Sequence, residues 1–230
     1  MSRWKEVWAR RSLDPSRGSM LTQLLAADGF DSGFGGIDED AWRAFVDEVA
    51  GTLALRQEDA VFDVGCGAGA FVYPMYEAGL RVGGIDQSEA LIDAARRVMP
   101  EGAWTVGEAS ALDPAEPYDV VVACGSFLYF PDHDYARGVL ARMTAKATRA
   151  VAILDVPDAS LRDEALAARR GALGEAEYEA RYRGLDHLYF DRLWFLRMLD
   201  QMGCSAVQIT PRGIDGHRMG DFRFNVFARV

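Results

Sequence analysis

Two acids and three alternating glycines form the clearest chemical pattern in the chain. Asp63 ends a short apolar run, and Gly65, Gly67 and Gly69 follow it. Glycines suit a turn that needs unusual dihedrals and lets a ligand approach the backbone closely. A second acid, Asp86, comes roughly 20 residues beyond the glycines, where dinucleotide-binding folds hold a nucleotide ribose. A carboxylate has two acceptor oxygens, so Asp86 suits the two vicinal hydroxyls of a ribose.

These residues must be positioned by a strand, a tight turn and a helix. The run 60–65 predicts a buried strand, 69–79 an amphipathic helix and 81–86 a second strand that ends at Asp86. Further along the chain, helices are expected at 88–99 and 133–145, and strands at 103–107, 118–124 and 148–155. Such alternation predicts a parallel sheet with right-handed crossovers and helices on both faces.

Different patterns flank this alternation. Residues 3–11 and 38–55 have helical spacing, and the loop 28–36 is rich in glycine and aspartate but carries Phe30 and Phe34. This loop fits a lid over a ligand or a surface loop pinned to the core by two aromatics, so residues 1–55 are expected to form a helical extension and lid.

The segment after the fifth strand has another composition. Its charges alternate in sign over 159–184, as on a solvated helix surface. Two more strands are expected at 204–210 and 222–230, and the second of them alternates apolar with polar residues.

The glycine turn and its acids resemble the first motif of the class I S-adenosylmethionine-dependent methyltransferases. Asp63, Gly65, Gly67 and Gly69 match their acid-x-Gly-x-Gly-x-Gly, and Asp86 matches their acid after the second strand.

The resemblance spans about residues 55 to 160. Gly107-Glu108-Ala109 matches the family's acid and small residue before the fourth strand, with Glu where Asp is more usual, and 118–124 matches that strand.

The resemblance implies a fold and a domain arrangement. The expected fold is α/β, a doubly wound, seven-stranded, mostly parallel Rossmann-like sheet whose last strand is antiparallel. The cofactor-binding domain covers 56–230, and a helical insertion at about 157–200 covers the substrate.

The resemblance also implies which residues bind S-adenosyl-L-methionine. The turn would contact the amino-acid part of the cofactor, Asp63 would face its ammonium group, and Asp86 would bind the ribose. Glu108 and Ala109 would line the adenine edge. Phe127 and Tyr129 would either face the sulfonium, which an aromatic ring attracts, or belong to the core. The expected set is Asp63, Gly65, Cys66, Gly67, Gly69, Asp86, Gln87, Glu108, Ala109, Cys124, Gly125, Phe127 and Tyr129.

Catalysis is expected to be mainly alignment of the acceptor with the methyl group, aided by at most one protein base. His133, His187 and Asp155 are the candidate bases, and Tyr189 is a candidate for orienting a polar substrate. Surface or capping roles suit both histidines equally well.

Composition limits the partners. The net charge of -10 and a pI near 4.8 disfavour nucleic acid, which lysine and arginine clusters bind. The acidic balance favours solubility, or a neutral or cationic substrate. The three cysteines and three histidines lack disulfide or metal-ligand spacing, so no metal is expected. No apolar run approaches a membrane span and the N-terminus lacks a secretory apolar region, which predicts a cytoplasmic protein. A monomer or homodimer is expected.

The leading interpretation is a methyltransferase acting on an oxygen, nitrogen or carbon nucleophile of a small molecule, by preference a bacterial metabolite or natural product. An NAD-dependent oxidoreductase shares the strand–glycine–helix pattern. The Gly-x-Gly-x-Gly spacing and the lack of a Tyr-x-x-x-Lys pair argue against it. A protein that binds S-adenosylmethionine without transferring its methyl group is the third interpretation.

Overall fold

A seven-stranded sheet forms the centre of the computed structural model, which describes residues 3–30, 36–211, 214 and 217–230. The strand order is β3-β2-β1-β4-β5-β7-β6. Strands β1 to β5 pair in parallel, whereas β7 is antiparallel to both β5 and β6. The seven-stranded fold predicted from the sequence, with its antiparallel last strand, is therefore confirmed. The strands are β1 Ala60–Val64, β2 Arg81–Asp86, β3 Ala103–Val106, β4 Tyr118–Cys124, β5 Ala147–Pro157, β6 Ser205–Pro211 and β7 Arg223–Arg229.

The register brings the chemically interesting strand ends to one edge of the sheet. Asp63 in β1 pairs with Gly84 in β2 and with Val122 in β4. Cys124, the last residue of β4, pairs with Leu154 in β5. Because parallel strands end at a common edge, Asp63, Asp86 and Asp155 all lie near the same side of the molecule.

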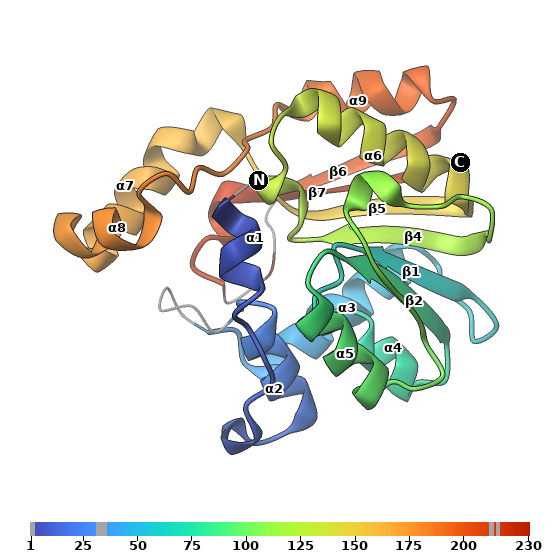
Figure 1. The fold of residues 1–230 in the computed structure, drawn as a ribbon. Helices are drawn as coiled ribbons and strands as arrows, with labels where there is room; N and C mark the ends of the chain where they lie inside the picture. The colour runs from blue at the N-terminus through green and yellow to red at the C-terminus, as the bar shows by residue number, and fades with distance from the viewer. Residues whose placement is uncertain (1–2, 31–35, 212–213, 215–216) are drawn as a thin grey trace.

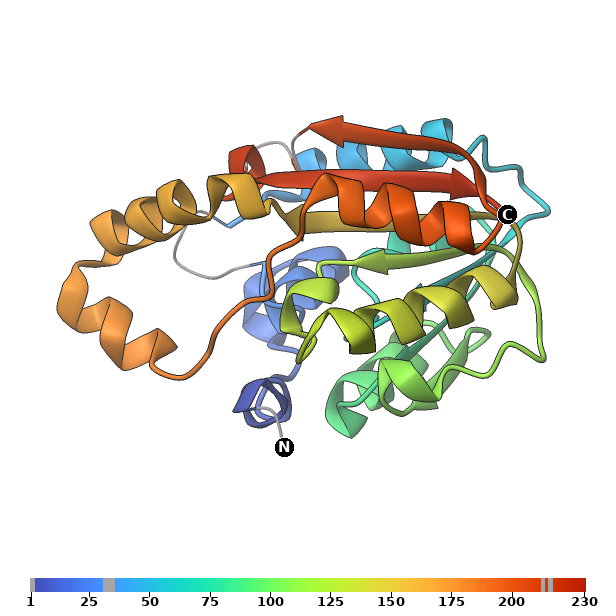
Figure 2. The same cartoon turned by 90° about the horizontal axis from the view of Figure 1, so that it is seen from above.

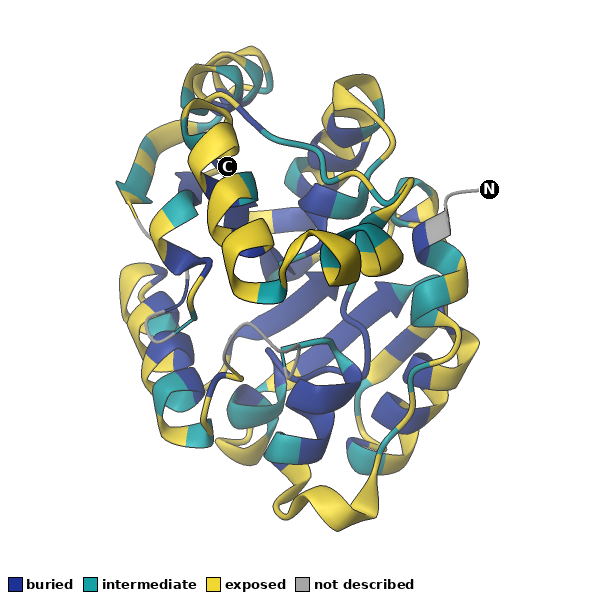
Figure 3. Cartoon of the chain, turned by 90° about the vertical axis from the view of Figure 1, so that its left-hand side faces the viewer, coloured by how far each residue is buried: buried dark blue, intermediate teal, exposed yellow. Residues whose placement is uncertain are grey.

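Helices cover both faces of the sheet. On one face, α2 (Met20–Ala27), α3 (Glu39–Thr52), α4 (Tyr73–Glu77) and α5 (Glu89–Val98) pack in one core. On the other face, α6 (His133–Lys146) and α9 (Arg192–Gln201) pack in a second core. Figure 3 shows the buried strands between helices whose outer sides are exposed. The alternation of strand and helix predicted this layering.

Two helix starts show how aspartate carboxylates hold the first backbone N–H groups. The Asp38 carboxylate accepts the Ala41 N–H at the start of α3, as capping aspartates do. Ser88 occupies the N-cap position of α5, but its side chain makes no capping hydrogen bond. The Asp86 carboxylate accepts the Ser88 N–H instead.

Four helices lie beside the carboxyl ends of the parallel strands. Helix α1 (Arg3–Trp8) and α2 come from the N-terminal segment, and α7 (Arg162–Leu173) and α8 (Glu175–Tyr182) follow β5. Figures 1 and 2 show α7 and α8 extending past the end of the sheet, with α1 beside them. Helix α2 was not predicted from the sequence. No helix in the described ranges is long and apolar enough to cross a membrane.

Candidate functional site

The turn after β1 requires its glycines. Gly65, Gly67 and Gly69 have φ values of 78°, 56° and 90°, in the left-handed region that side chains rarely adopt. A Cβ on Gly67 would lie 2.2 Å from Asp28 Oδ1, and one on Gly65 would lie 2.5 Å from the Ser126 Cβ. The glycine positions of the turn therefore have no room for a Cβ, and the turn presents its backbone at the sheet edge.

Asp86 stabilises this turn as well as facing it. Its Oδ2 accepts the Gly67 N–H at 3.0 Å and its Oδ1 accepts the Ser88 N–H at 2.8 Å. Each carboxylate oxygen can accept a further hydrogen bond, so the group remains able to bind a pair of hydroxyls. Burial raises the pKa of Asp86 above its usual value.

Asp28, at the end of α2, is a site residue that sequence reasoning missed. Its carboxylate accepts the Ala68 N–H at 2.6 Å and the Ala70 N–H at 2.9 Å. Burial raises the pKa of Asp28 to about 7. The sequence placed Asp28 in the N-terminal loop, and nothing local to it indicates contact with a turn 40 residues away.

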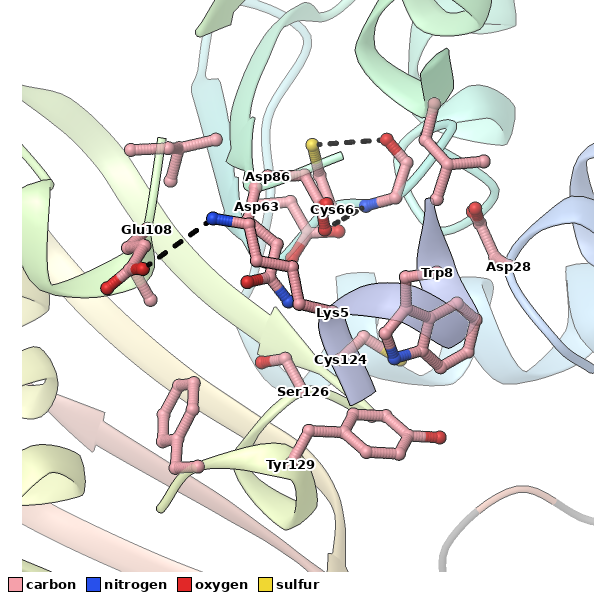
Figure 4. Close-up of a pocket in the computed structure, with 18 of the residues that line it drawn as sticks. Lys5, Trp8, Asp28, Asp63, Cys66, Asp86, Glu108, Cys124, Ser126 and Tyr129 are labelled. Carbon is pink, nitrogen blue, oxygen red and sulfur yellow. Dashed lines mark hydrogen bonds and ion pairs between the residues drawn. The ribbon is translucent and has the colours of Figure 1, made fainter. Parts of the chain in front are cut away.

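A cavity of about 340 Å³ lies between the glycine turn and α1. Figure 4 shows Asp63 and Asp86 near each other at the turn, with the Lys5 amine reaching Glu108 across the cavity. Of the predicted cofactor-binding residues, those that line it are Asp63, Gly65, Cys66, Gly67, Asp86, Gln87, Glu108, Ala109, Cys124, Gly125 and Tyr129.

Two predicted residues lie outside this cavity lining. Gly69 ends the turn, where a Cβ would meet the Met99 Cε at 2.5 Å. Phe127 is 1% exposed and packs with Phe190 and Phe195 in the core. Phe127 was expected either to face the sulfonium or to belong to the core, and in the structure it belongs to the core.

Carboxyl groups gather where the cavity meets the sheet. Asp63 is 1% exposed, and its Oδ1 has no hydrogen-bond partner among the described residues. Burial raises the pKa of Asp63 well above its usual value, and the neighbouring Asp28 charge raises it further. A buried carboxylate group without a partner is costly, so this end of the cavity suits a cationic ligand.

A second cavity, also of about 340 Å³, adjoins the first. The residues that line both cavities are Trp8, Asp28, Phe30, Gly125 and Tyr129. The second cavity extends from this shared boundary to α7 and α8, and its outer wall includes Arg169 and Tyr182. Two ligands, one in each cavity, would contact each other at the end of β4.

Only two of the four predicted catalytic residues line this second cavity, namely Asp155 and His187. Asp155 has φ of 56°, and its Oδ1 has no hydrogen-bond partner in the described part of the chain. His187 stacks on Trp4 with ring centroids 5.0 Å apart, and its buried Nε2 likewise makes no hydrogen bond to the described residues. Burial lowers the pKa of His187 well below 6.5, so its imidazole is neutral at pH 7.

His133 and Tyr189 belong to a different arrangement. His133 is exposed at the start of α6, and its Nε2 lies 3.1 Å from the Tyr189 carbonyl oxygen. The Tyr189 ring lies 5.7 Å from the Arg162 guanidinium carbon. Neither residue lines either cavity. Asp155 and His187 thus line one cavity, whereas His133 contacts the Tyr189 backbone outside both cavities.

Known proteins share the motif-bearing part of this chain. Residues 61–163 match the family model of a methyltransferase domain. The trans-aconitate 2-methyltransferase of Azoarcus sp. (strain BH72) is 29% identical over 105 residues, which cover 42% of each chain. The dTDP-4-amino-2,3,4,6-tetradeoxy-D-glucose N,N-dimethyltransferase of Saccharopolyspora spinosa is 28% identical over 148 residues, 62% of this chain and 55% of that one. The chain thus spans only about half of these curated relatives, or less.

A solved structure extends the likeness to nearly the whole fold. Magnesium protoporphyrin IX methyltransferase from Synechocystis PCC 6803, crystallised with S-adenosylhomocysteine, superposes with a TM-score of 0.58 at 16% identity. The superposition covers 99% of this chain and 91% of that one. The superposition shows that the two chains share a fold, and the domain match covers the segment that carries the glycine turn and its acids.

Proposed function

We infer that this chain, in which residues 61–163 carry a methyltransferase domain, is an S-adenosylmethionine-dependent methyltransferase acting on a small molecule. The observation that carries the proposal is the pairing of two adjoining cavities at one sheet edge. One is built on the glycine turn and Asp86, and the other borders it at Gly125. Two substrates held side by side are what a group transfer requires, because alignment supplies much of its acceleration.

The residues of the first cavity fit the cofactor chemically. S-adenosylmethionine supplies an electrophilic methyl group on a sulfonium and also carries an ammonium group and a ribose diol. The unpartnered Asp63 Oδ1 and the raised pKa of Asp28 mark a buried negative region that a cationic ligand would stabilise. Asp86 would bind the ribose hydroxyls through its remaining lone pairs, and Glu108 and Ala109 would line the adenine.

The second cavity would bind the methyl acceptor, with Asp155 positioned to accept its proton. The Asp155 Oδ2 lies 3.8 Å from where a Cβ on Gly125 would stand, at the boundary between the cavities. Its left-handed backbone conformation is costly for a non-glycine residue, and such strain gathers at functional sites. His187, neutral and also in this cavity, is the alternative base.

Equilibrium binding tests the cofactor. Isothermal titration should give micromolar or tighter binding of S-adenosylhomocysteine and no comparable signal for NAD. Tight NAD binding with no S-adenosylhomocysteine signal would overturn the proposal. Turnover of S-adenosylmethionine with a panel of small acceptors then separates an enzyme from a protein that only binds the cofactor.

Substitution tests the base. Asp155→Asn should reduce kcat by about 10²–10⁴-fold, the usual contribution of a general base, with cofactor affinity intact. His133→Ala is the matched control and should keep near-normal turnover, since His133 lies outside both cavities. If Asp155→Asn retains full activity while His187→Ala loses it, the base is His187. If both retain it, alignment alone accounts for catalysis.

A further inference from the structure

The second cavity is positively charged although the whole chain is negative. Its lining contains arginines at four positions, Arg11, Arg169, Arg181 and Arg223, against the acids Asp28 and Asp155. The formal net charge of the chain is -10. A cationic lining in so acidic a protein is a local feature of this cavity, and the overall charge does not predict it.

Arg169, in the middle of α7, is the most informative of these residues. It is 5% exposed, yet among the described residues its guanidinium has no hydrogen bond and no carboxylate within ion-pair distance. Its guanidinium carbon lies 5.3 Å from the centroid of the Tyr182 ring. An aromatic face offsets only part of the cost of burying a charge, so an anionic partner would stabilise this side chain strongly.

The other arginines are engaged differently. Arg223 is also 5% exposed, but its Nη1 donates to the Asp155 carbonyl at 3.2 Å and lies 3.8 Å from Asp155 Oδ2. Arg181 lies on the exposed side and pairs with Glu177 at 2.6 Å. Arg11 Nη1 donates to the Ala26 carbonyl at 2.8 Å. Among the described arginines that line the cavity, Arg169 is therefore the buried one whose guanidinium forms no hydrogen bond or ion pair with a described residue.

The rest of the wall suits a flat molecule. Trp4, Trp8, Tyr129 and Tyr182 line the cavity with His187. Trp4 stacks on His187 and meets Tyr129 edge to face at 4.7 Å. Burial lowers the pKa of His187, and the charges of Arg169 and Arg223 lower it further, which places these cations close to the ring.

We propose that the methyl acceptor carries a carboxylate or phosphate group on a flat apolar body, and that Arg169 binds this anionic group. The guanidinium fork matches either anion in a bidentate manner. The inference rests on the proposed methyl transfer, because it takes the second cavity as the acceptor site. It also differs from the neutral or cationic substrate that was one of the two interpretations of the net charge, the other being solubility.

Three probes of one shape test the proposal, namely benzoate, phenyl phosphate and the neutral benzamide. Each is titrated into protein saturated with S-adenosylhomocysteine and into protein without it. At least one anion should bind with a dissociation constant at least tenfold lower than that of benzamide. The anion that binds more tightly shows whether the site prefers a carboxylate or a phosphate. Arg169→Met should weaken that anion by about 10- to 100-fold, the value of hydrogen bonds to a charged group, and leave benzamide unchanged.

Arg170→Met is the matched control. Arg170 follows Arg169 on α7 but is exposed, pairs with Glu175 at 3.8 Å and does not line the cavity. Arg169→Lys keeps the positive charge at the buried position but not the guanidinium fork, so its loss of anion affinity should be intermediate. This variant keeps the proposal testable if the Met variant misfolds.

Two results would overturn the proposal. Benzamide could bind as well as both anions, or Arg169→Met could bind the anions no more weakly than Arg170→Met does. A failure of S-adenosylhomocysteine to bind refutes the proposed function instead, and the titrations without it still decide whether Arg169 is an anion site.

Discussion

The affinity for S-adenosylhomocysteine should rise with pH between 6 and 8. Burial raises the pKa of Asp28 from 3.8 to about 7, so this carboxyl group is largely protonated at pH 6 and ionised at pH 8. The ligand carries an ammonium group, which the ionised carboxylate attracts and the protonated form does not. Ionisation also strengthens the hydrogen bonds that Asp28 accepts from Ala68 and Ala70 in the glycine turn.

The size of the effect follows from the pKa. If the ligand binds only the ionised form, the apparent dissociation constant is multiplied by one plus the ratio of protonated to ionised Asp28. With a pKa of about 7, that factor is about 11 at pH 6, about 2 at pH 7 and about 1.1 at pH 8. The dissociation constant should therefore fall roughly tenfold from pH 6 to pH 8, with proton release on binding near pH 7.

Isothermal titration in buffers of different ionisation enthalpy measures both the affinity and the released protons. Asp28→Asn is the control, because it keeps the side-chain shape and one acceptor oxygen but cannot titrate. Because the Asp28 charge also raises the pKa of Asp63, the difference between the two pH slopes reports the titration of Asp28 together with its effect on Asp63. Identical slopes in the two proteins would refute the role assigned to Asp28.

Three further outcomes are expected. Asp86→Ala should weaken S-adenosylhomocysteine binding by about 10- to 100-fold and lower the melting temperature, because Gly67 and Ser88 lose their acceptors; an unchanged dissociation constant would leave Asp86 with the capping role alone. Gly67→Ala should be strongly destabilised in thermal melts, because its Cβ would lie 2.2 Å from Asp28 Oδ1, whereas Gly138→Ala, with open space around it, should be tolerated. Limited proteolysis of the loop 28–36 should slow when S-adenosylhomocysteine is bound, and equal cleavage rates would count against a lid.

The fold and the turn were predictable because their signals are local. The glycines, Asp63 and Asp86 stand at fixed spacings along one strand–turn–strand unit, and alternation fixed the parallel sheet. The hydrogen bonds that Asp86 accepts from Gly67 and Ser88 were not predicted. Those bonds depend on how the second strand meets the turn, which the spacing alone does not reveal.

The remaining site residues depend on contacts between distant segments. Phe127 and Tyr129 share a short 3-10 turn, Phe127–Tyr129, and only the packed structure decides that Tyr129 faces the cavities while Phe127 enters the core. The positive cavity combines Arg169 and Arg181, from a segment predicted as a solvated helix surface, with Arg223, from a segment predicted as a half-buried strand. Phe34, the second aromatic of the proposed lid, lies outside the described residues.

The stacking of Trp4 on His187 has a consequence for engineering. The Trp4 indole N–H also donates to the Asp186 carbonyl at 3.0 Å, so α1 and the segment after α8 form one wall from opposite parts of the sequence. Grafting α7, α8 and the segment after them from another protein would therefore separate two halves of a single wall. Changes of acceptor specificity should require α1 and this segment to be exchanged together, as one module.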